Sequence, residues 1–146
     1  MATNKAIMKA SLLIIGDDLI HHQKVEELLY LNAYPIYYQC FSDASDAFNY
    51  ILNHNDFEAL PDLVLLDLDM PFVSWKGFLE LFETITQSLE KRVDVIVYTS
   101  SVDADIKSQM AHYNCVKGVV HKPLTQDIFD EILSSSFVLV NKASKY

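Results

Sequence analysis

The chain has 146 residues, of which 51% are hydrophobic, and it carries a formal net charge of −9. This length and composition suffice for one compact domain with its own core. Nucleic-acid binding normally requires a basic face, and no cluster of Lys and Arg supplies one, so the composition excludes that class. No apolar run approaches the roughly 20 residues needed to cross a bilayer, and no signal peptide is recognisable. We therefore expect a soluble, cytoplasmic protein without nucleic-acid or membrane partners.

Five short apolar runs predict β-strands, and amphipathic segments after them predict helices. The runs are continuous rather than alternating in hydrophobicity, which is typical of parallel strands buried on both faces. The predicted strands cover residues 11–15, 36–41, 63–66, 93–98 and 118–120. The helical apolar faces lie at residues 25–29, 44–52, 78–89, 106–113 and 128–133, with an extension to Phe137 and Val140. Ser42 is the expected N-cap of the second helix.

A strand followed by a helix, repeated along the whole chain, predicts an α/β domain. Such alternation implies one mostly parallel sheet with helices on both faces. No linker rich in Pro, Gly or Ser interrupts the pattern. Sheets of this kind bind ligands just beyond the carboxyl ends of their strands. The side chains at those ends are therefore the candidate functional residues.

Four of the predicted strands end in acidic, hydroxyl or basic residues, two of the groups with a proline after them. These are Asp17 and Asp18 after the first strand, Asp67, Asp69 and Pro71 at the third, Thr99 after the fourth, and Lys122 and Pro123 after the fifth. Crowded carboxylates repel one another, and a divalent cation removes that conflict. Oxygen ligands without thiolate or imidazole favour a hard ion, so Mg²⁺ is the expected cofactor.

The same groups suit phosphoryl transfer, which depends mainly on positioning and charge neutralisation. Asp67 would be the nucleophile and would form an acyl phosphate. Mg²⁺, Lys122 and the Thr99 hydroxyl can together cover the three phosphoryl oxygens. Backbone N–H groups after Asp67 and Thr99 could add further donors.

The set resembles the receiver domain of response regulators in two-component phosphorelay signalling, the CheY-like family, over roughly residues 10–137. The matching residues are Asp17-Asp18, Asp67 with Pro71 four positions later, Thr99, and Lys122-Pro123. The resemblance implies a flavodoxin-like (βα)5 three-layer sandwich with strand order 2-1-3-4-5. It also implies Mg²⁺ bound by Asp18, Asp67 and the backbone carbonyl of Asp69, with Asp17 acting through water.

The resemblance further implies a phosphoryl donor, which is the phosphohistidine of a sensor histidine kinase or of a phosphotransfer protein. Phosphorylation would draw Thr99 inward and reshape the surface of the fourth helix, fifth strand and fifth helix, through which a homodimer could also form. We expect residues 1–146 to be a single receiver domain without an output domain, so that a downstream protein target receives the signal. The domain would catalyse only its own phosphorylation and dephosphorylation and would not be an enzyme otherwise.

Three features depart from the family pattern. The position three residues before Lys122, which is usually aromatic, is Val119, so the usual readout of activation by a moving ring is in doubt. The segment 72–76 is expected to be a loop about two residues longer than is typical, with Trp75 as a partly buried anchor. Asp69 and Ser101 occupy variable positions that influence the lifetime of the phosphate.

Histidines near the acidic pair are expected to lie outside the site. His21 and His22 are adjacent, and because neighbours on a helix point in different directions, they are interpreted as surface residues. His121 should point away from the site, since side chains alternate along a strand. Asp17 has a second interpretation as the cap of the first helix.

Other interpretations of the acidic residues stay open. Asp67-Leu68-Asp69 after an apolar strand resembles the opening of haloacid-dehalogenase-type phosphatases, in which Asp69 would be the general acid. Pro71, the earlier acidic pair and the absence of a late acidic pair argue against that family. A binding module that signals without phosphate, encouraged by Val119, is the second alternative, and a purely structural ion-pair cluster of Asp18, Asp67 and Lys122 is the third.

Overall fold

The computed structural model describes residues 10–32 and 36–136, and these form a single sheet flanked by helices. The strands are β1 (Ala10–Ile15), β2 (Ile36–Phe41), β3 (Leu63–Asp67), β4 (Asp94–Thr99) and β5 (Val116–His121). The helices are α1 (Leu19–Asn32), α2 (Ala44–Asn53), α3 (Phe72–Ile85), α4 (Asp105–Met110) and α5 (Gln126–Ser136), with a short 3₁₀ turn, η2 (Thr86–Ser88), after α3.

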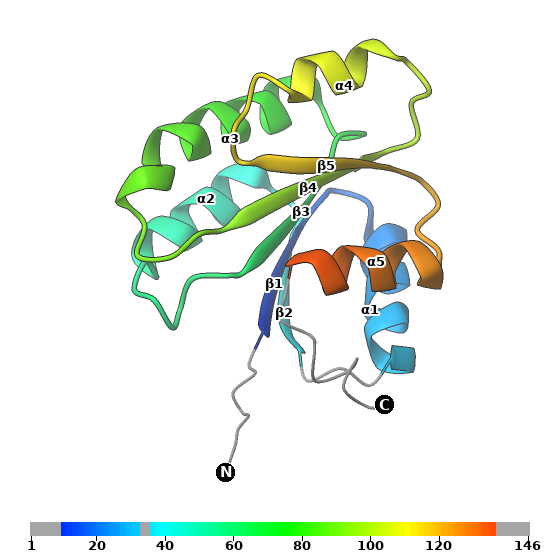
Figure 1. Ribbon diagram of the computed structural model, residues 1–146, viewed down its shortest axis with the longest axis horizontal. Helices are drawn as coiled ribbons and strands as arrows, with labels where there is room; N and C mark the ends of the chain where they lie inside the picture. Colours follow the sequence, from blue (N-terminus) through cyan, green and yellow to red (C-terminus); the bar gives the residue numbers. More distant parts are fainter. Residues whose placement is uncertain (1–9, 33–35, 137–146) are drawn as a thin grey trace.

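The sheet has the order β2-β1-β3-β4-β5, and all four pairings are parallel. Helices α1 and α5 cover one face, and α2, α3 and α4 lie on the other (Figure 1). The predicted flavodoxin-like three-layer architecture and its strand order are therefore confirmed. All strands point the same way, so their carboxyl ends meet at one edge, the carboxyl edge.

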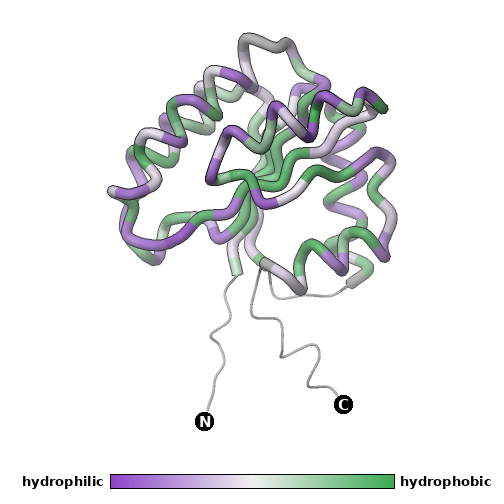
Figure 2. The backbone as a smooth tube through the Cα atoms, turned by 45° about the horizontal axis from the view of Figure 1, so that its top comes forward, coloured by the Kyte–Doolittle hydropathy of each residue, from purple (hydrophilic) through white to green (hydrophobic). Residues whose placement is uncertain are grey.

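Two hydrophobic clusters hold the layers together, one on each face of the sheet. The cluster under α2 and α3 contains the stacked rings of Phe78 and Phe82, whose centroids lie 5.4 Å apart. The other cluster packs α1 and α5 against the sheet, with Val25 and Phe129 fully buried. Every residue of β3 is buried, as a strand with a helical layer on each side requires. Figure 2 shows the hydrophobic strands at the centre and helices of mixed hydropathy around them.

The segment 72–76, expected to be a loop, forms the first turn of α3, so that prediction is wrong. The Pro71 carbonyl accepts hydrogen bonds from the amides of Ser74 (2.9 Å) and Trp75 (3.4 Å), which starts the helix immediately after the proline. Trp75 is a buried helix residue of the core rather than a loop anchor. Gly77 is tolerated inside the helix, where it has open space around its Cα.

The cap of the second helix also differs from expectation. Asp43, and not Ser42, caps α2, because its Oδ1 accepts the amide of Ser45 at 2.8 Å. Both residue types cap well, and the helix simply begins one residue later. Phe137 and Val140, the predicted extension of the last helix, lie outside the described residues. Within the described ranges, no helix is long and apolar enough to span a membrane.

Candidate functional site

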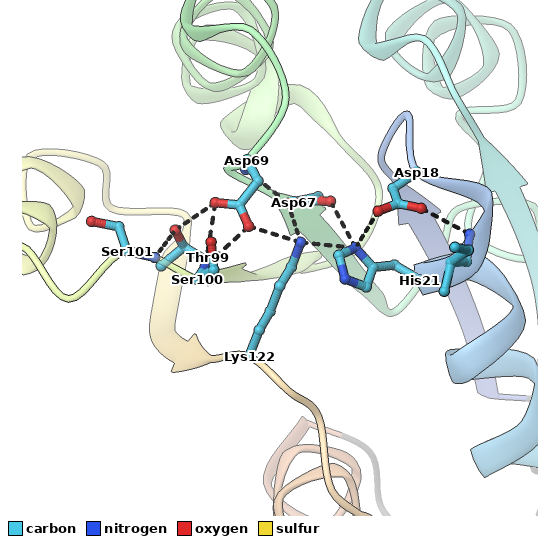
Figure 3. Close-up of polar contacts among 9 residues, drawn as sticks. Asp18, His21, Asp67, Asp69, Thr99, Ser100, Ser101 and Lys122 are labelled. Atoms are coloured by element: carbon cyan, nitrogen blue, oxygen red, sulfur yellow. Dashed lines mark hydrogen bonds and ion pairs between the residues drawn. The ribbon is translucent and has the colours of Figure 1, made fainter.

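The carboxyl edge brings together residues that are far apart in the sequence. Asp18 follows β1, Asp67 ends β3, Thr99 ends β4 and Lys122 follows β5. Figure 3 shows their side chains converging on one region, as the sequence predicts. Asp67 and Thr99 are almost completely buried, with exposed fractions of 1% and 2%. A buried carboxylate requires compensating donors, and the site is built from them.

Asp67 lies at the centre and is held through one of its two oxygens. Its Oδ1 accepts the Lys122 ammonium at 2.9 Å and the backbone amide of Asp69 at 2.7 Å. Gly16 makes room for this side chain, because a Cβ at position 16 would lie 2.9 Å from the Asp67 Cβ and 3.2 Å from Oδ2. Glycine is therefore required at position 16 by close approach.

Lys122 connects the parts of the site. Its ammonium lies 2.9 Å from Asp67 Oδ1, 2.9 Å from Asp69 Oδ2 and 2.9 Å from His21 Nδ1. It also lies 5.1 Å from the ring centroid of Tyr98, which forms the apolar floor of the site. The side chain is only 7% exposed, so its charge is largely withdrawn from water and directed at the two carboxylates.

The Asp69 side chain faces into the site, whereas the sequence argument used only its backbone carbonyl. Its Oδ1 accepts the Thr99 hydroxyl at 2.9 Å, and its Oδ2 accepts the Ser100 amide at 3.0 Å. Burial raises the pKa of this carboxyl, but hydrogen bonds from Lys122, Ser100 and Thr99 outweigh burial and leave the pKa below its ordinary value. Asp69 is therefore held as an anion. Because Asp69 lies beyond the end of β3, the alternation of side chains along the strand does not predict where its carboxylate points.

Asp18 has two roles, one for each oxygen. Its Oδ1 accepts the Ile20 amide at 2.9 Å and thereby caps α1, while Oδ2 faces His21 Nδ1 at 3.4 Å. The cap of the first helix is therefore Asp18, and the alternative interpretation of Asp17 as that cap is wrong. Asp17 is exposed beside the site.

The prediction that His21 and His22 are surface residues is wrong. His21 Nδ1 lies between two carboxylates, 3.4 Å from Asp18 Oδ2 and 3.6 Å from Asp67 Oδ2. His22 is 6% exposed and points elsewhere, as neighbours on a helix do. The signal for His21 was its spacing of three from Asp18, which places both on one face of α1. His121 is exposed and makes none of the contacts that build the site, in accordance with expectation.

Two oxygens of the site fit a hard cation. Asp18 Oδ2 and Asp67 Oδ2 face a common region of the site, since they lie 3.4 and 3.6 Å from the same atom, His21 Nδ1. The described residues contain no cluster of three or more His, Cys, Asp and Glu side chains that could hold a metal. Mg²⁺ needs no such cluster, because it usually keeps several waters and takes one or two carboxylates. The donor set therefore fits Mg²⁺.

A cavity of about 470 Å³ opens beside the site. Its lining combines the polar side chains of His21, Asp69 and Lys122 with Ile20, Leu124 and the ring of Tyr98. Val119, at the usual aromatic position, is partly buried on β5 and packs against the core under α2 and α3. The aromatic ring beside Lys122 thus comes from Tyr98 on β4, and burial raises the pKa of that phenol.

Comparison with known proteins agrees with this geometry. The family model of the response regulator receiver domain matches residues 12–134. The fold and this match define a response regulator receiver domain. The chain belongs to the family of response regulator receiver domains of two-component systems. A search of curated proteins found no significant match.

Solved structures of low identity share the fold. A two-component response regulator from Cytophaga hutchinsonii is 21% identical, with a TM-score of 0.76 and coverage of 88% of this chain and 98% of that one. One from Legionella pneumophila is 23% identical, with a TM-score of 0.73 and coverage of 87% and 99%. A chemotaxis protein from Vibrio cholerae is 18% identical, with a TM-score of 0.71 and coverage of 89% and 100%.

Proposed function

We propose that this receiver domain accepts a phosphoryl group on Asp67 from the phosphohistidine of a sensor histidine kinase or a phosphotransfer protein. One observation carries the proposal: a buried carboxylate at the carboxyl edge of the sheet, with one oxygen fixed by Lys122 and the other facing the His21 imidazole, which also faces Asp18. A structural carboxylate would have both oxygens satisfied. This one keeps Oδ2 without a hydrogen bond to any of the described residues.

In the transfer, a carboxylate oxygen of Asp67 attacks phosphorus while the phosphorus–nitrogen bond to the donor imidazole breaks. The electron pair of that bond stays on the imidazole, which takes up a proton. Lys122 and the Thr99 hydroxyl supply positive charge and a hydrogen bond to the phosphoryl oxygens, and the Ser100 amide adds a further donor.

Asp18 and Asp67 would hold Mg²⁺, together with the backbone carbonyl of Asp69 and, through water, Asp17. When bound, the ion neutralises part of the negative charge of the two carboxylates and the incoming phosphoryl group. Asp18 can serve without unfolding α1, because the cap uses only its Oδ1.

The proposed output is a change of the surface formed by α4, β5 and α5, read by a downstream protein or by a second copy of the domain. Thr99 ends β4, directly before the segment that leads to α4, so a shift of its hydroxyl reaches that surface through the chain. Val119 offers no ring to follow Thr99, so the readout would depend on the backbone between Thr99 and α4. A cytoplasmic location accords with a kinase as donor.

The decisive experiment is incubation with Mg²⁺ and either acetyl phosphate or phosphoramidate, followed by intact-protein mass spectrometry. We expect the mass gain of one phosphoryl group, its loss in Asp67→Asn, and its retention in Asp46→Asn, which alters an exposed carboxylate on α2. No gain with either donor would contradict the proposal and favour a binding module that works without phosphate. Release of phosphate from an external ester would favour the phosphatase.

The phosphatase alternative gains no support from the site. It needs Asp69 as a general acid, which must carry a proton at the working pH. The hydrogen bonds around Asp69 hold the pKa of its carboxyl below the ordinary value, so the proton is absent near neutrality.

A further inference from the structure

Three donors at the carboxyl edge are engaged by a single carboxylate. The Thr99 hydroxyl, the Ser100 amide and the Lys122 ammonium, here called the anion cradle, all contact the oxygens of Asp69, at 2.9, 3.0 and 2.9 Å. Figure 3 shows the Asp69 carboxylate with Thr99 and Ser100 on one side and Lys122 and Asp67 on the other.

The donors of the anion cradle are those that phosphoryl transfer to Asp67 requires. The Thr99 hydroxyl and the Ser100 amide each have one hydrogen to donate, and both already point at Asp69. A phosphoryl group on Asp67 and the Asp69 carboxylate cannot both take these hydrogens. Two anions in one pocket also repel each other strongly at low dielectric.

We propose that the Asp69 carboxylate is an internal substitute for the phosphoryl group, which occupies the anion cradle before phosphorylation and must leave it when phosphate arrives. This inference rests on the function proposed above. It assigns Asp69 as a positioning residue: it holds Thr99 and Lys122 on its own carboxylate before phosphorylation, and it delays entry of the phosphoryl group.

The surroundings of Asp69 permit such an exchange. Its side chain is 30% exposed, whereas Asp67 is 1% exposed, so Asp69 can swing towards solvent without opening the core. Asp67 is 1% exposed and contacts Lys122, the backbone amide of Asp69 and His21, so a phosphoryl donor reaches it only after a neighbouring group moves. Asp69 carries the negative charge among these neighbours, and the negative phosphoryl group displaces its side chain by repulsion.

Kinetics of phosphorylation test the delay. With phosphoramidate and Mg²⁺, Asp69→Asn and Asp69→Ala should be phosphorylated about tenfold faster than the unchanged domain, since about 1.4 kcal/mol of carboxylate contacts no longer compete. Asp103→Asn removes one negative charge from the nearby β4–α4 loop without touching the cradle, and its rate should stay within about twofold. Rates in the Asp69 variants equal to or below that of the unchanged domain overturn the delay.

Formate binding tests the cradle independently of phosphorylation. In ¹H–¹⁵N spectra without any phosphoryl donor, Asp69→Ala should shift the Ser100 amide strongly, and added formate should return it towards its original position. The unchanged domain should show no saturable formate response, because its cradle is filled. A Ser100 amide that does not respond to formate in Asp69→Ala overturns the internal substitute. Absence of phosphorylation in every form would refute the proposed function, while the formate titration would still decide the occupancy of the cradle. If Asp69→Ala is unfolded, Asp69→Asn is used in its place. In that variant, the shift of the Ser100 amide is measured without added formate.

Discussion

At the amino edge of the sheet, where the strands begin, Asp62 and Glu83 each have donors of their own. At the carboxyl edge, by contrast, Asp67 and Asp69 share a single lysine. At the amino edge, Asp62 accepts the Ser11 amide at 2.8 Å and pairs with Lys91 at 2.9 Å. Glu83 accepts the amides of Asn114 (2.9 Å) and Cys115 (3.1 Å). These groups tie helices and loops to the starts of strands.

At the carboxyl edge, Asp67 and Asp69 both depend on Lys122, and Asp18 faces only the imidazole of His21 through its second oxygen. Crowded anions of this kind cost folding free energy unless a cation joins them. The comparison teaches that the carboxylates of one edge are each paired within the fold, whereas those of the other are crowded around one cation, as the proposed function requires. Each change below tests one side of this difference.

The largest effect is expected from Lys122→Met, which keeps the apolar stem and removes the shared charge. Asp67 would remain buried without its cation, so the free energy of unfolding should fall by about 3 kcal/mol. Urea unfolding measures this, with Lys107→Met on the exposed face of α4 as a control that should change it by less than about 0.5 kcal/mol. Addition of Asp67→Asn should restore most of the loss. If Lys122→Met alone lowered the free energy of unfolding by less than about 1 kcal/mol, the carboxylates of the carboxyl edge would not depend on the charge of Lys122.

A smaller loss, about 2 kcal/mol, is expected from Glu83→Gln at the amino edge. Glutamine has one acceptor oxygen, so one of the two backbone amides loses its partner. Glu80→Gln on the same helix removes an exposed pair with Lys76 and should cost less than about 0.5 kcal/mol. Equal losses in the two variants would contradict a structural role for Glu83.

The Glu83 effect should also depend on pH in a defined direction. Burial raises the pKa of this carboxyl, but the hydrogen bonds from Cys115 and Asn114 outweigh burial and leave the pKa below its ordinary value of 4.5. A lowered pKa in the folded state gives stability that is full above pH 4.5 and is lost as the pH falls through the folded-state value. The gap between Glu83→Gln and the unchanged domain should therefore close in acid.

Sequence reasoning succeeded where the chain direction alone decides the outcome. Asp67 and Thr99 end apolar runs, and parallel strands bring such ends to one edge whatever the details of packing. Lys122 follows the fifth run for the same reason. The strand order needed the family resemblance, because hydrophobic periodicity does not specify which strands are neighbours.

Sequence reasoning failed where a side-chain direction or a helix start depends on tertiary contacts. His21 reaches the site because α1 begins at Leu19, directly after Asp18, and the sequence alone does not show where that helix begins. The segment 72–76 lies between Pro71 and Gly77 and is predicted as a loop longer than is typical of the family, but hydrogen bonds to the Pro71 carbonyl start α3 there. The direction of the Asp69 carboxylate follows from the donors on β4 and β5, which are remote in sequence.

A third change, Asp18→Asn, should affect ligand binding more than folding. Asparagine caps a helix as well as aspartate, so α1 should keep its start. The loss of one anionic ligand should weaken Mg²⁺ binding about tenfold, or about 1.4 kcal/mol. The rise of the melting temperature with Mg²⁺ concentration measures the affinity. Asp43→Asn makes the same replacement at the cap of α2 and should leave the affinity unchanged; a parallel fall in that variant would mean that Asp18 is not a ligand.

The smallest effect is expected from Asp62→Asn at the amino edge. The amide oxygen can still accept the Ser11 amide, so the variant loses only the ion pair with Lys91. Lys91 is 13% exposed and lies 5.1 Å from the ring centroid of Phe57, so its position is held by packing as well as by charge. We expect a loss of about 1 kcal/mol in urea unfolding, which shrinks at high salt because a partly exposed pair is screened. Arg92→Met removes a more exposed pair with Asp94, in which the arginine is 73% exposed, and should change stability by less than Asp62→Asn. If the Asp62→Asn loss were as large as that of Lys122→Met, ion pairs at the two edges would be equivalent, and the carboxyl edge would have no special dependence on its single lysine.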